Sequence, residues 1–306
     1  MPRVYFYSLL ALMVGCGTVV LMGHPDSDVS LESARAIWAD TLRDADAVGL
    51  QATRVSPARE MQLGDEMAAQ IVPWGQEDPE ATRYVGAVAA SLIPHAHRQD
   101  IRFHIHVIRS AQVNAFALPG GHIYVLTGLL DFLQSEAELA AILGHEISHV
   151  DLRHCIERYQ YQLALRRFGA PEAGEIAGIA HALVAFGYTQ DQELEADAAG
   201  EQLAIEAGYD PDAAVAVFNR MQTRFGGAAH KPASTPADEA AGAVIDAIGS
   251  YFRTHPPSHQ RAVQLSDLLA RNHRELAGRI VYKGVRNFQS RIPRGTQELP
   301  DEKHIY

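Results

Sequence analysis

Residues 145–149 read His-Glu-Ile-Ser-His, and this short pattern constrains the fold of the chain more than any other feature. On an α-helix, residues i and i+4 differ by about 40° of rotation, so His145 and His149 project from one face. Two imidazole nitrogens placed in this way can bind one tetrahedral zinc ion at about 2.0–2.1 Å. The pattern therefore predicts a helix that carries two metal ligands.

The surrounding residues favour a buried helix over an exposed one. Ser135 followed by Glu138 is a capping-box pattern, which starts a helix. Apolar residues then recur at helical spacing and give the helix a buried face: Leu139, Ile142, Leu143, Ile147 and Val150. A surface helix that shows two histidines and a glutamate by chance is the alternative, and it fits this apolar context poorly.

A third metal ligand is predicted further along the chain, where residues 193–197 read Glu-Leu-Glu-Ala-Asp. Glu193 and Asp197 are again i and i+4 on a predicted helix, so they share a face. We interpret Glu193 as a ligand and Asp197 as an acceptor for the outer N–H of a ligating histidine. Glu195 lies roughly 160° away and is expected to face solvent. An acidic first turn favoured by the helix dipole would explain one or two of these carboxylates, but not the set.

The remaining member of the pattern, Glu146, is expected to move protons rather than to bind metal. Zinc lowers the pKa of a bound water towards 7, and a neighbouring carboxylate can take its proton as it attacks a peptide carbonyl. The same carboxylate can then pass the proton to the leaving amine. These residues together predict one zinc ion per chain and a zinc-dependent endopeptidase.

A small antiparallel β-sheet is predicted before this helix. Residues 101–108 alternate apolar and polar side chains, and residues 115–118 and 122–126 form a hairpin around the turn Pro119-Gly120-Gly121. His104 and His106 share one strand face, which we interpret as a partly exposed face because nothing nearby in the sequence completes a metal site. The chain is otherwise mostly helical to about residue 271, so the predicted fold is mainly α with a small sheet (α+β).

The N-terminus predicts export. Arg3 precedes an apolar run that ends in Leu-Met-Val-Gly-Cys, which resembles a bacterial lipoprotein box with Cys16 as the lipid-bearing residue. Residues 4–23 are also long enough to span a bilayer as an uncleaved helix, and simple secretion is a third possibility. Each alternative places the catalytic part outside the cytoplasm, so we expect a periplasmic protein anchored by a lipid or by one helix.

Four segments follow from these patterns. We expect a signal or anchor at 1–23, a spacer helix at 24–60, a metallopeptidase domain at 61–286 and a C-terminal tail at 287–306. Residues 226–243 are rich in Ala, Gly, Pro and Ser and are interpreted as a flexible surface insertion.

Composition excludes other classes of protein. A net charge of −11 argues against a nucleic-acid partner, which would require a basic surface. Cys16 and Cys155 are the only cysteines, so no disulfide framework is implied. Cys155 is expected to be a small buried helix residue, and Arg153-His154 to pack beneath the site. No Cys-x-x-Cys-His motif supports a haem protein.

Four motifs in order carry a family resemblance: residues 114–121, 145–149, 193–197 and 254–257. Together they resemble the gluzincin family of zinc metallopeptidases that includes the CAAX prenyl protease, the heat-shock protease HtpX, mitochondrial Oma proteases and the periplasmic β-barrel assembly-enhancing protease. The resemblance covers about residues 61–286 and is greatest to short lipoprotein-like periplasmic members. It implies a zincin-like domain with an active-site helix and a substrate-binding edge strand.

The resemblance also implies roles for individual residues. The strand of Asn114, Ala115, Phe116, Ala117 and Leu118 is expected to bind a substrate peptide as an added strand, with Asn114 facing the scissile bond. His255 and Arg261 correspond to a late pair that approaches the catalytic zone. In membrane-embedded relatives that histidine stabilises the transition state, and in periplasmic ones it can be an inhibitory fourth zinc ligand; the sequence leaves both open.

Two departures limit the resemblance. Only the N-terminal segment is apolar enough to span a membrane, and no internal repeat is visible, so we expect no helical-repeat array after the catalytic region. The expected substrates are unfolded or misassembled polypeptides of the bacterial envelope. A zinc-containing, chaperone-like binding module with latent proteolysis is the main alternative, although such a module would have no need of Glu146.

Overall fold

The structure is a computed structural model that describes residues 54–71, 75–167, 187–225, 255 and 259–306. Its contacts divide the chain into two units, Met1–Ala52 and Thr53–Tyr306. All described residues belong to the second unit. The predicted N-terminal signal or anchor, Cys16, most of the spacer and the 226–243 insertion lie outside the described residues. No helix within the described ranges is both long and apolar enough to cross a membrane.

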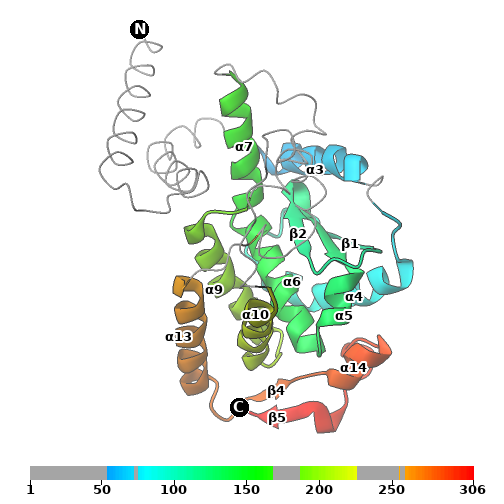
Figure 1. Cartoon of the computed structure of the whole chain (residues 1–306), viewed down its shortest axis with the longest axis vertical. Coiled ribbons are helices and arrows are strands. Elements are labelled where there is room, and N and C mark those ends of the chain that lie inside the picture. The colour runs from blue at the N-terminus through cyan, green and yellow to red at the C-terminus, as the bar shows by residue number, and fades with distance from the viewer. Residues whose placement is uncertain (1–53, 72–74, 168–186, 226–254, 256–258) are drawn as a thin grey trace. The chain divides into compact units, whose positions relative to one another are not determined.

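Helices make up most of the described unit (Figure 1). They are α3 (Pro57–Ile71), α4 (Pro79–Leu92), α5 (Thr127–Phe132), α6 (Glu136–Asp151), α7 (His154–Arg167), α9 (Gln190–Glu206), α10 (Asp212–Phe225), α13 (His259–Glu275) and α14 (Val285–Ser290). Short 3-10 turns occur at Ile93–His95, Pro119–Gly121 and Pro300–Glu302. The prediction of a mainly helical chain with a small sheet is confirmed.

The three-stranded sheet has the order β1-β3-β2, with β1 at His104–Ile108, β2 at Ala115–Leu118 and β3 at His122–Leu126. The β2–β3 hairpin is antiparallel, and its turn has the predicted position. In contrast, β1 pairs with β3 in parallel, so the sheet is mixed and the prediction of a wholly antiparallel sheet was wrong in this respect. Alternating side chains identify a strand but not its neighbour, and here β3 lies between the two earlier strands.

Helices cover both faces of this sheet. Ala115, Ala117 and Val125 belong to one core cluster with residues of α4 and α6. Their neighbours along the strands, Phe116 and Tyr124, belong to a second cluster with residues of α3 and α7. Successive side chains of a strand point to opposite faces, so the sheet is the middle layer of a helix–sheet–helix arrangement.

Helix α6 begins where the sequence predicts. Ser135 is its N-cap, and the hydroxyl oxygen accepts a hydrogen bond from the Glu138 backbone N–H at 3.2 Å. The helix ends at Asp151 with Leu152 as its C-cap, and Arg153 then takes a φ of 69°, a left-handed conformation that turns the chain into α7. This turn sets the angle between the last residues of α6 and the start of α7.

Helices α6 and α9 cross at two glycines. A Cβ at Gly144 would lie 2.5 Å from the Gly200 carbonyl oxygen, and a Cβ at Gly200 would lie 2.6 Å from the His145 nitrogen. No side chain other than hydrogen fits at either position, so the two backbones touch. This contact brings residues 145–149 of α6 beside residues 193–197 of α9.

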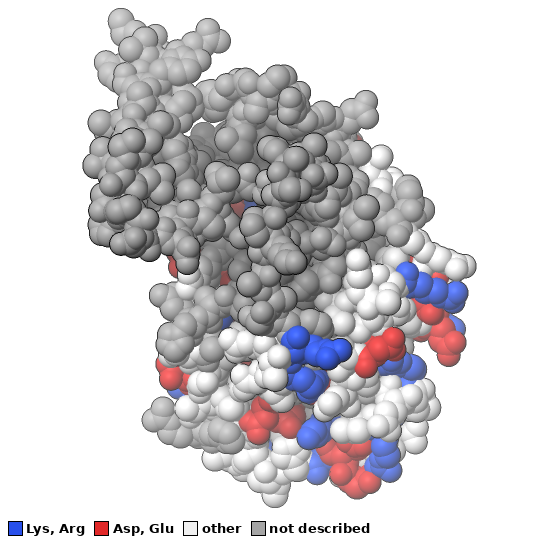
Figure 2. Space-filling view, viewed as in Figure 1, with Lys and Arg blue, Asp and Glu red and all other residues white. Residues whose placement is uncertain are grey.

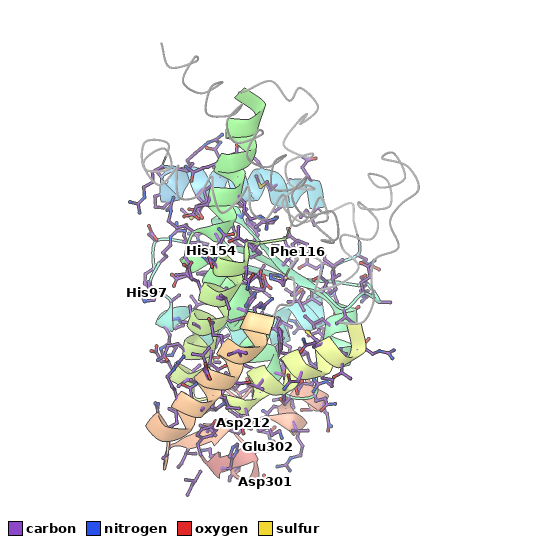
Figure 3. All side chains as sticks on the ribbon, turned by 60° about the vertical axis from the view of Figure 1, so that its left-hand side comes forward. His97, Phe116, His154, Asp212, Asp301 and Glu302 are labelled. Carbon is purple, nitrogen blue, oxygen red and sulfur yellow. The ribbon has the colours of Figure 1, made fainter. Side chains whose placement is uncertain are left out.

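The C-terminal residues form a second, two-stranded sheet, in which β4 (Ile280–Tyr282) pairs antiparallel with β5 (Lys303–Ile305). The Arg294 N–H donates to buried Glu136 at 3.0 Å, so this end of the chain packs on the start of α6. Arg286 forms ion pairs with Asp301 and Glu302, two of the labelled residues at the lower end of Figure 3. On the face in Figure 2, coloured side chains of both signs are mixed at this end of the molecule.

Candidate metal centre

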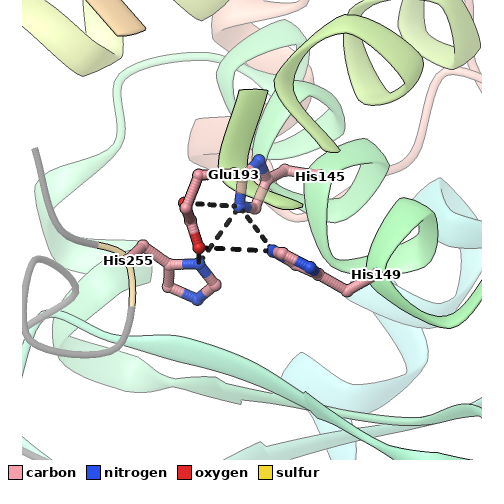
Figure 4. Close-up of side chains that lie close together, drawn as sticks. All are labelled: His145, His149, Glu193 and His255. Carbon is pink, nitrogen blue, oxygen red and sulfur yellow. Dashed lines mark hydrogen bonds and ion pairs between the residues drawn. The ribbon is translucent and has the colours of Figure 1, made fainter. Parts of the chain in front are cut away.

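Four buried side chains converge where α6 and α9 cross: His145, His149, Glu193 and His255 (Figure 4). Nε2 of His145 lies 3.0 Å from Nε2 of His149 and 3.1 Å from Nδ1 of His255. The Glu193 carboxylate lies 3.5 Å from the first of these histidines and 3.6 Å from the second. Ligand atoms around a tetrahedral zinc lie roughly 3.3 Å apart, given bonds of about 2.0–2.1 Å. The spacing and the nitrogen–oxygen donor set therefore fit a zinc ion.

Asp197 holds the outer nitrogen of one predicted ligand. Its Oδ1 lies 3.0 Å from Nδ1 of His145, so the nitrogen on the other side of the ring remains directed at the cluster. Arg261 in turn donates to both oxygens of Asp197 at 2.8 Å. A carboxylate bonded in this way fixes both the ring orientation and the tautomer of a ligating histidine.

Arg261 also contacts the other two parts of the cluster. Its Nη1 lies 2.6 Å from Glu193 Oε2 and donates to the His255 carbonyl oxygen at 3.2 Å. Burial would raise the pKa of Glu193, but the charges of Arg261 and His255 hold it well below its usual range. Glu193 is therefore a carboxylate, the form that binds metal.

The cluster favours a positive charge at its centre. Burial opposes protonation of His145, yet Asp197 and Glu193 raise the pKa of its imidazole to about 10. Two buried carboxylates thus face one ring, and either a proton or a metal cation can neutralise them. The need for a positive charge at this place agrees with the nitrogen and oxygen donors, which also suit a metal cation.

The outer nitrogen of His149 has a partner that the sequence did not predict. Nδ1 of His149 lies 3.0 Å from Nδ1 of His154, and Nε2 of His154 lies 3.0 Å from the Glu195 carboxylate. His154, labelled in Figure 3, is buried, whereas Glu195 is half exposed. Tyr188 stacks on the His149 ring with a centroid distance of 3.6 Å.

His154 was expected beneath the site and Glu195 on the solvent side, and both descriptions hold. The contact between His154 and Glu195 could nevertheless not be predicted from the sequence, because the left-handed turn at Arg153 sets the direction of His154. A histidine five residues after a predicted ligand was the available signal. Cys155 is buried against Tyr188, and burial raises the pKa of its thiol to about 12, so it is no thiolate.

Glu146 is completely buried beside the cluster. Its Oε1 lies 3.2 Å from Nε2 of His255, while its Oε2 has no hydrogen-bond partner among the described residues. A buried carboxylate oxygen with no such partner is unfavourable unless a water or a substrate contacts it. Its position agrees with a proton-transferring role, and the His255 ring lies between Glu146 and Glu193.

The predicted substrate-binding strand lies close to this centre. Among the described strands, β2 forms one edge of its sheet, and it packs against α6. Asn114 precedes β2 and is buried, and its carbonyl oxygen accepts from the Leu126 N–H at 3.0 Å. The structure thus brings His145, His149, Glu193, Asp197, His255 and Arg261 into direct contact and places residues 114–118 alongside α6.

Known proteins resemble this chain over much of its length. The chain is 33% identical over 211 residues to the β-barrel assembly-enhancing protease of Escherichia coli K12, which covers 61% of this chain and 42% of that protein. It is 31% identical to the mitochondrial metalloendopeptidase OMA1 of Schizosaccharomyces pombe, covering 68% and 57%. It is 25% identical to the E. coli metalloprotease YcaL, covering 85% and 93%.

The chain spans about half the length of the first two relatives. The sequence also matches the family model of M48 peptidases over residues 79–269, which includes residues 145–149, 193–197, His255 and Arg261. The family predicted from the four sequence motifs is confirmed. The chain belongs to peptidase family M48.

Proposed function

We propose that this protein is a zinc-dependent endopeptidase. The observation that carries the proposal is the buried set of His145, His149 and Glu193, which has tetrahedral spacing and lies next to the Glu146 carboxylate. Membership of family M48 and the metalloprotease names of the relatives support the same activity.

Each residue of the site has a role in this proposal. Zinc, when bound, would supply a Lewis acid that activates water and polarises the scissile carbonyl. Glu146 takes a proton from the attacking water and returns it to the leaving amine. Asp197 and His154 hold the outer nitrogens of His145 and His149, so that the inner nitrogens keep their direction.

We propose polypeptides as substrates, bound in an extended conformation. Residues 114–118 include the edge strand β2, and an extended peptide can add to such an edge through main-chain hydrogen bonds. Both faces of β2 are buried, so the edge rather than a face of the strand is the part that can bind a peptide. Asn114, directly before β2, would face the scissile bond.

We also propose that the protein acts in the bacterial envelope on unfolded or misassembled proteins. The relative named for β-barrel assembly supports this substrate class, and the N-terminal lipoprotein-like sequence supports a periplasmic, membrane-anchored location. Cys16→Ser tests the anchor: a lipoprotein would leave the membrane fraction or accumulate unprocessed. A variant that stays membrane-bound with an intact N-terminus would instead indicate an uncleaved helix.

A binding module with latent proteolysis is the second candidate, and the position of His255 favours considering it. Nδ1 of His255 lies 3.0 Å from Glu193 Oε1, which is the position of a fourth metal ligand. A site closed in this way would hold zinc without cleaving peptides.

Zinc content and casein cleavage measured on the same samples test the proposal. We expect about one tightly bound zinc per chain, and Glu146→Gln should keep this zinc and lose cleavage, because Glu146 does not ligate. Glu80→Gln, which changes an exposed glutamate, is the matched control. Both glutamine variants should also be made in a His255→Ala background, because a latent wild type would show no cleavage for Glu146→Gln to remove. Stoichiometric zinc without cleavage in either background would favour the binding module.

A further inference from the structure

A second histidine cluster lies away from the catalytic centre, between α3 and the sheet. His104 and His106 are on β1, and His122 begins β3 directly opposite His104 in the parallel register. Alternate strand residues and register partners share a face, so all three rings lie on one side of the sheet. The ring of His122 stacks on those of His104 and His106, with centroid distances of 4.8 and 5.4 Å.

Helix α3 covers the same face and contributes a carboxylate. Oδ1 of Asp65 lies 3.1 Å from Nε2 of His122. Asp65, His104 and His122 each offer one ligand atom, and the three atoms lie within 4.8 Å of one another. His122 is buried, His104 is half-buried and Asp65 is exposed, so one ligand is fixed and the other two can rotate inwards to bonding distance.

A chain of contacts holds the far side of the His122 ring. Its Nδ1 lies 3.1 Å from Nε2 of His106, and Nδ1 of His106 lies 3.7 Å from the Glu77 carboxylate. His106 thus holds Nδ1 of His122 and leaves Nε2 directed at Asp65. The outer partner of a metal-binding histidine orients its ring in the same way. The sequence analysis rejected a site here because nothing near His104 and His106 in the chain completed it. The completing residues come from α3 and β3 instead.

We infer that Asp65, His104 and His122 form a second metal site, which binds a divalent transition metal of the zinc type. Two imidazoles and one carboxylate are a donor set that suits zinc, and three protein ligands leave a position for water. The inference concerns residues outside the catalytic centre and does not depend on the proposed activity.

The site would join α3 to the strands that lead into the predicted substrate edge. Helix α3 already touches the β2–β3 turn, since a Cβ at Gly64 would lie 2.2 Å from the Pro119 carbonyl oxygen. A metal held by Asp65 of α3 and by His104 and His122 of the sheet would add a link between the same elements. We therefore expect metal bound at this site to stabilise the protein and to order α3, and to have no direct role in peptide hydrolysis.

Equilibrium zinc binding to the full chain tests the inference, with free zinc set by a chelating buffer. The wild type should bind a second, weaker equivalent after the catalytic one. Asp65→Asn and His104→Asn should each weaken the second equivalent at least tenfold and leave the first intact. Both substituted side chains are accessible, so neither change is expected to prevent folding.

Matched controls and a background variant separate this site from the other. Asp131→Asn and His95→Asn change an exposed aspartate and an exposed histidine elsewhere and should bind zinc as the wild type does. His149→Ala should lose the tight equivalent and keep the weaker one, whether or not the proposed activity is correct. A wild type whose only zinc equivalent is lost in His149→Ala, or Asp65→Asn and His104→Asn curves that overlay the controls, would overturn the inference.

Discussion

His255 presents its two ring nitrogens to different parts of the site. Nδ1 faces His145 and Glu193, whereas Nε2 lies 3.2 Å from the carboxylate of Glu146. A ring in this position occupies the place of a fourth ligand in the proposed zinc site and covers Glu146, the proposed proton-transferring group, at the same time. The sequence left an inhibitory and a transition-state role open, and this placement favours the inhibitory one.

We therefore predict that His255→Ala raises basal casein cleavage severalfold and increases self-digestion. Removing the ring would open the fourth position and expose Glu146 to water. A transition-state donor would give the opposite result, a loss of roughly a hundredfold or more. The measurement is the initial rate at equal zinc content, with His97→Ala, which alters an exposed histidine, as control. An unchanged rate would exclude both roles.

The contact between His154 and Glu195 supports a prediction about metal affinity. Glu195→Gln removes the negative charge that orients His154, which in turn holds His149. Loss of such an outer partner lowers metal affinity by about 10–100-fold, and the half-exposed Glu195 should lie near the lower limit. Chelator competition measures the affinity, and Glu206→Gln on the same helix is the control. Equal affinities for the two variants would show that this contact is incidental.

Residue spacing within a helix was enough to predict much of this centre. The i, i+4 pairs His145–His149 and Glu193–Asp197 follow from helix geometry alone, and the structure places each pair as expected. The partner of His149 could not be predicted, because it depends on the turn at Arg153. A positive φ is usually indicated in a sequence by glycine, and this position is an arginine. The roles of these residues remain predictions until they are tested.

At the scale of elements, the centre depends on how closely α6 and α9 approach. The glycines at the crossing allow backbone contact, and the ligands of the two helices lie beside this point. Nothing in the sequence pairs Gly144 with Gly200, since a glycine inside a helix predicts only local weakness. The contact between the two helices explains why both positions are glycine, since a Cβ at either one would clash with the backbone of the other helix.

We predict that Gly200→Ala destabilises the protein by about 1–3 kcal/mol, the usual range for overpacking a core. The new Cβ would lie 2.6 Å from the backbone nitrogen of His145, so the helices must separate and zinc should bind more weakly. Gly86→Ala in α4 is the matched control, because no atom lies within 4 Å of its Cβ position. Helix propensity alone should make that control stabilising by roughly 1 kcal/mol.

Urea unfolding with and without zinc measures both effects of Gly200→Ala. A variant that unfolds at the wild-type urea concentration would show that α6 and α9 can separate without loss of stability.

The strands show which features of the fold the sequence patterns did not predict. Strands β2 and β3 were predicted to the residue, but the parallel partner of β3 and the three-residue strands β4 and β5 were not. Short strands have too few alternations to be recognised, and pairing order is a tertiary property.

For the whole molecule, a buried acid links stability to pH. Glu201 on α9 is buried; it accepts a hydrogen bond from Asn272, and its Oε2 has no hydrogen-bond partner among the described residues. It lines a cavity of about 40 Å³ together with Asp197 and His145. Burial, reinforced by Asp210 and other nearby carboxylates, raises the pKa of Glu201 to about 8. The folded protein therefore holds this proton at pH 7.

In the unfolded chain, Glu201 regains an ordinary pKa near 4.5. Between about pH 4.5 and 8 the folded state binds one more proton than the unfolded state, so the stability of the wild type falls as pH rises through this window.

Glu201→Gln cannot ionise and still offers Asn272 an oxygen. We predict that the variant gains stability relative to wild type as pH rises from 5 to 8, by up to about 1.4 kcal/mol per pH unit. Urea unfolding at each pH, at equal zinc, measures the difference, because other titrating groups affect both proteins alike. Glu206→Gln, at the exposed end of the same helix, should follow the wild type. Parallel curves for wild type and Glu201→Gln would mean that Glu201 is already ionised in the folded protein.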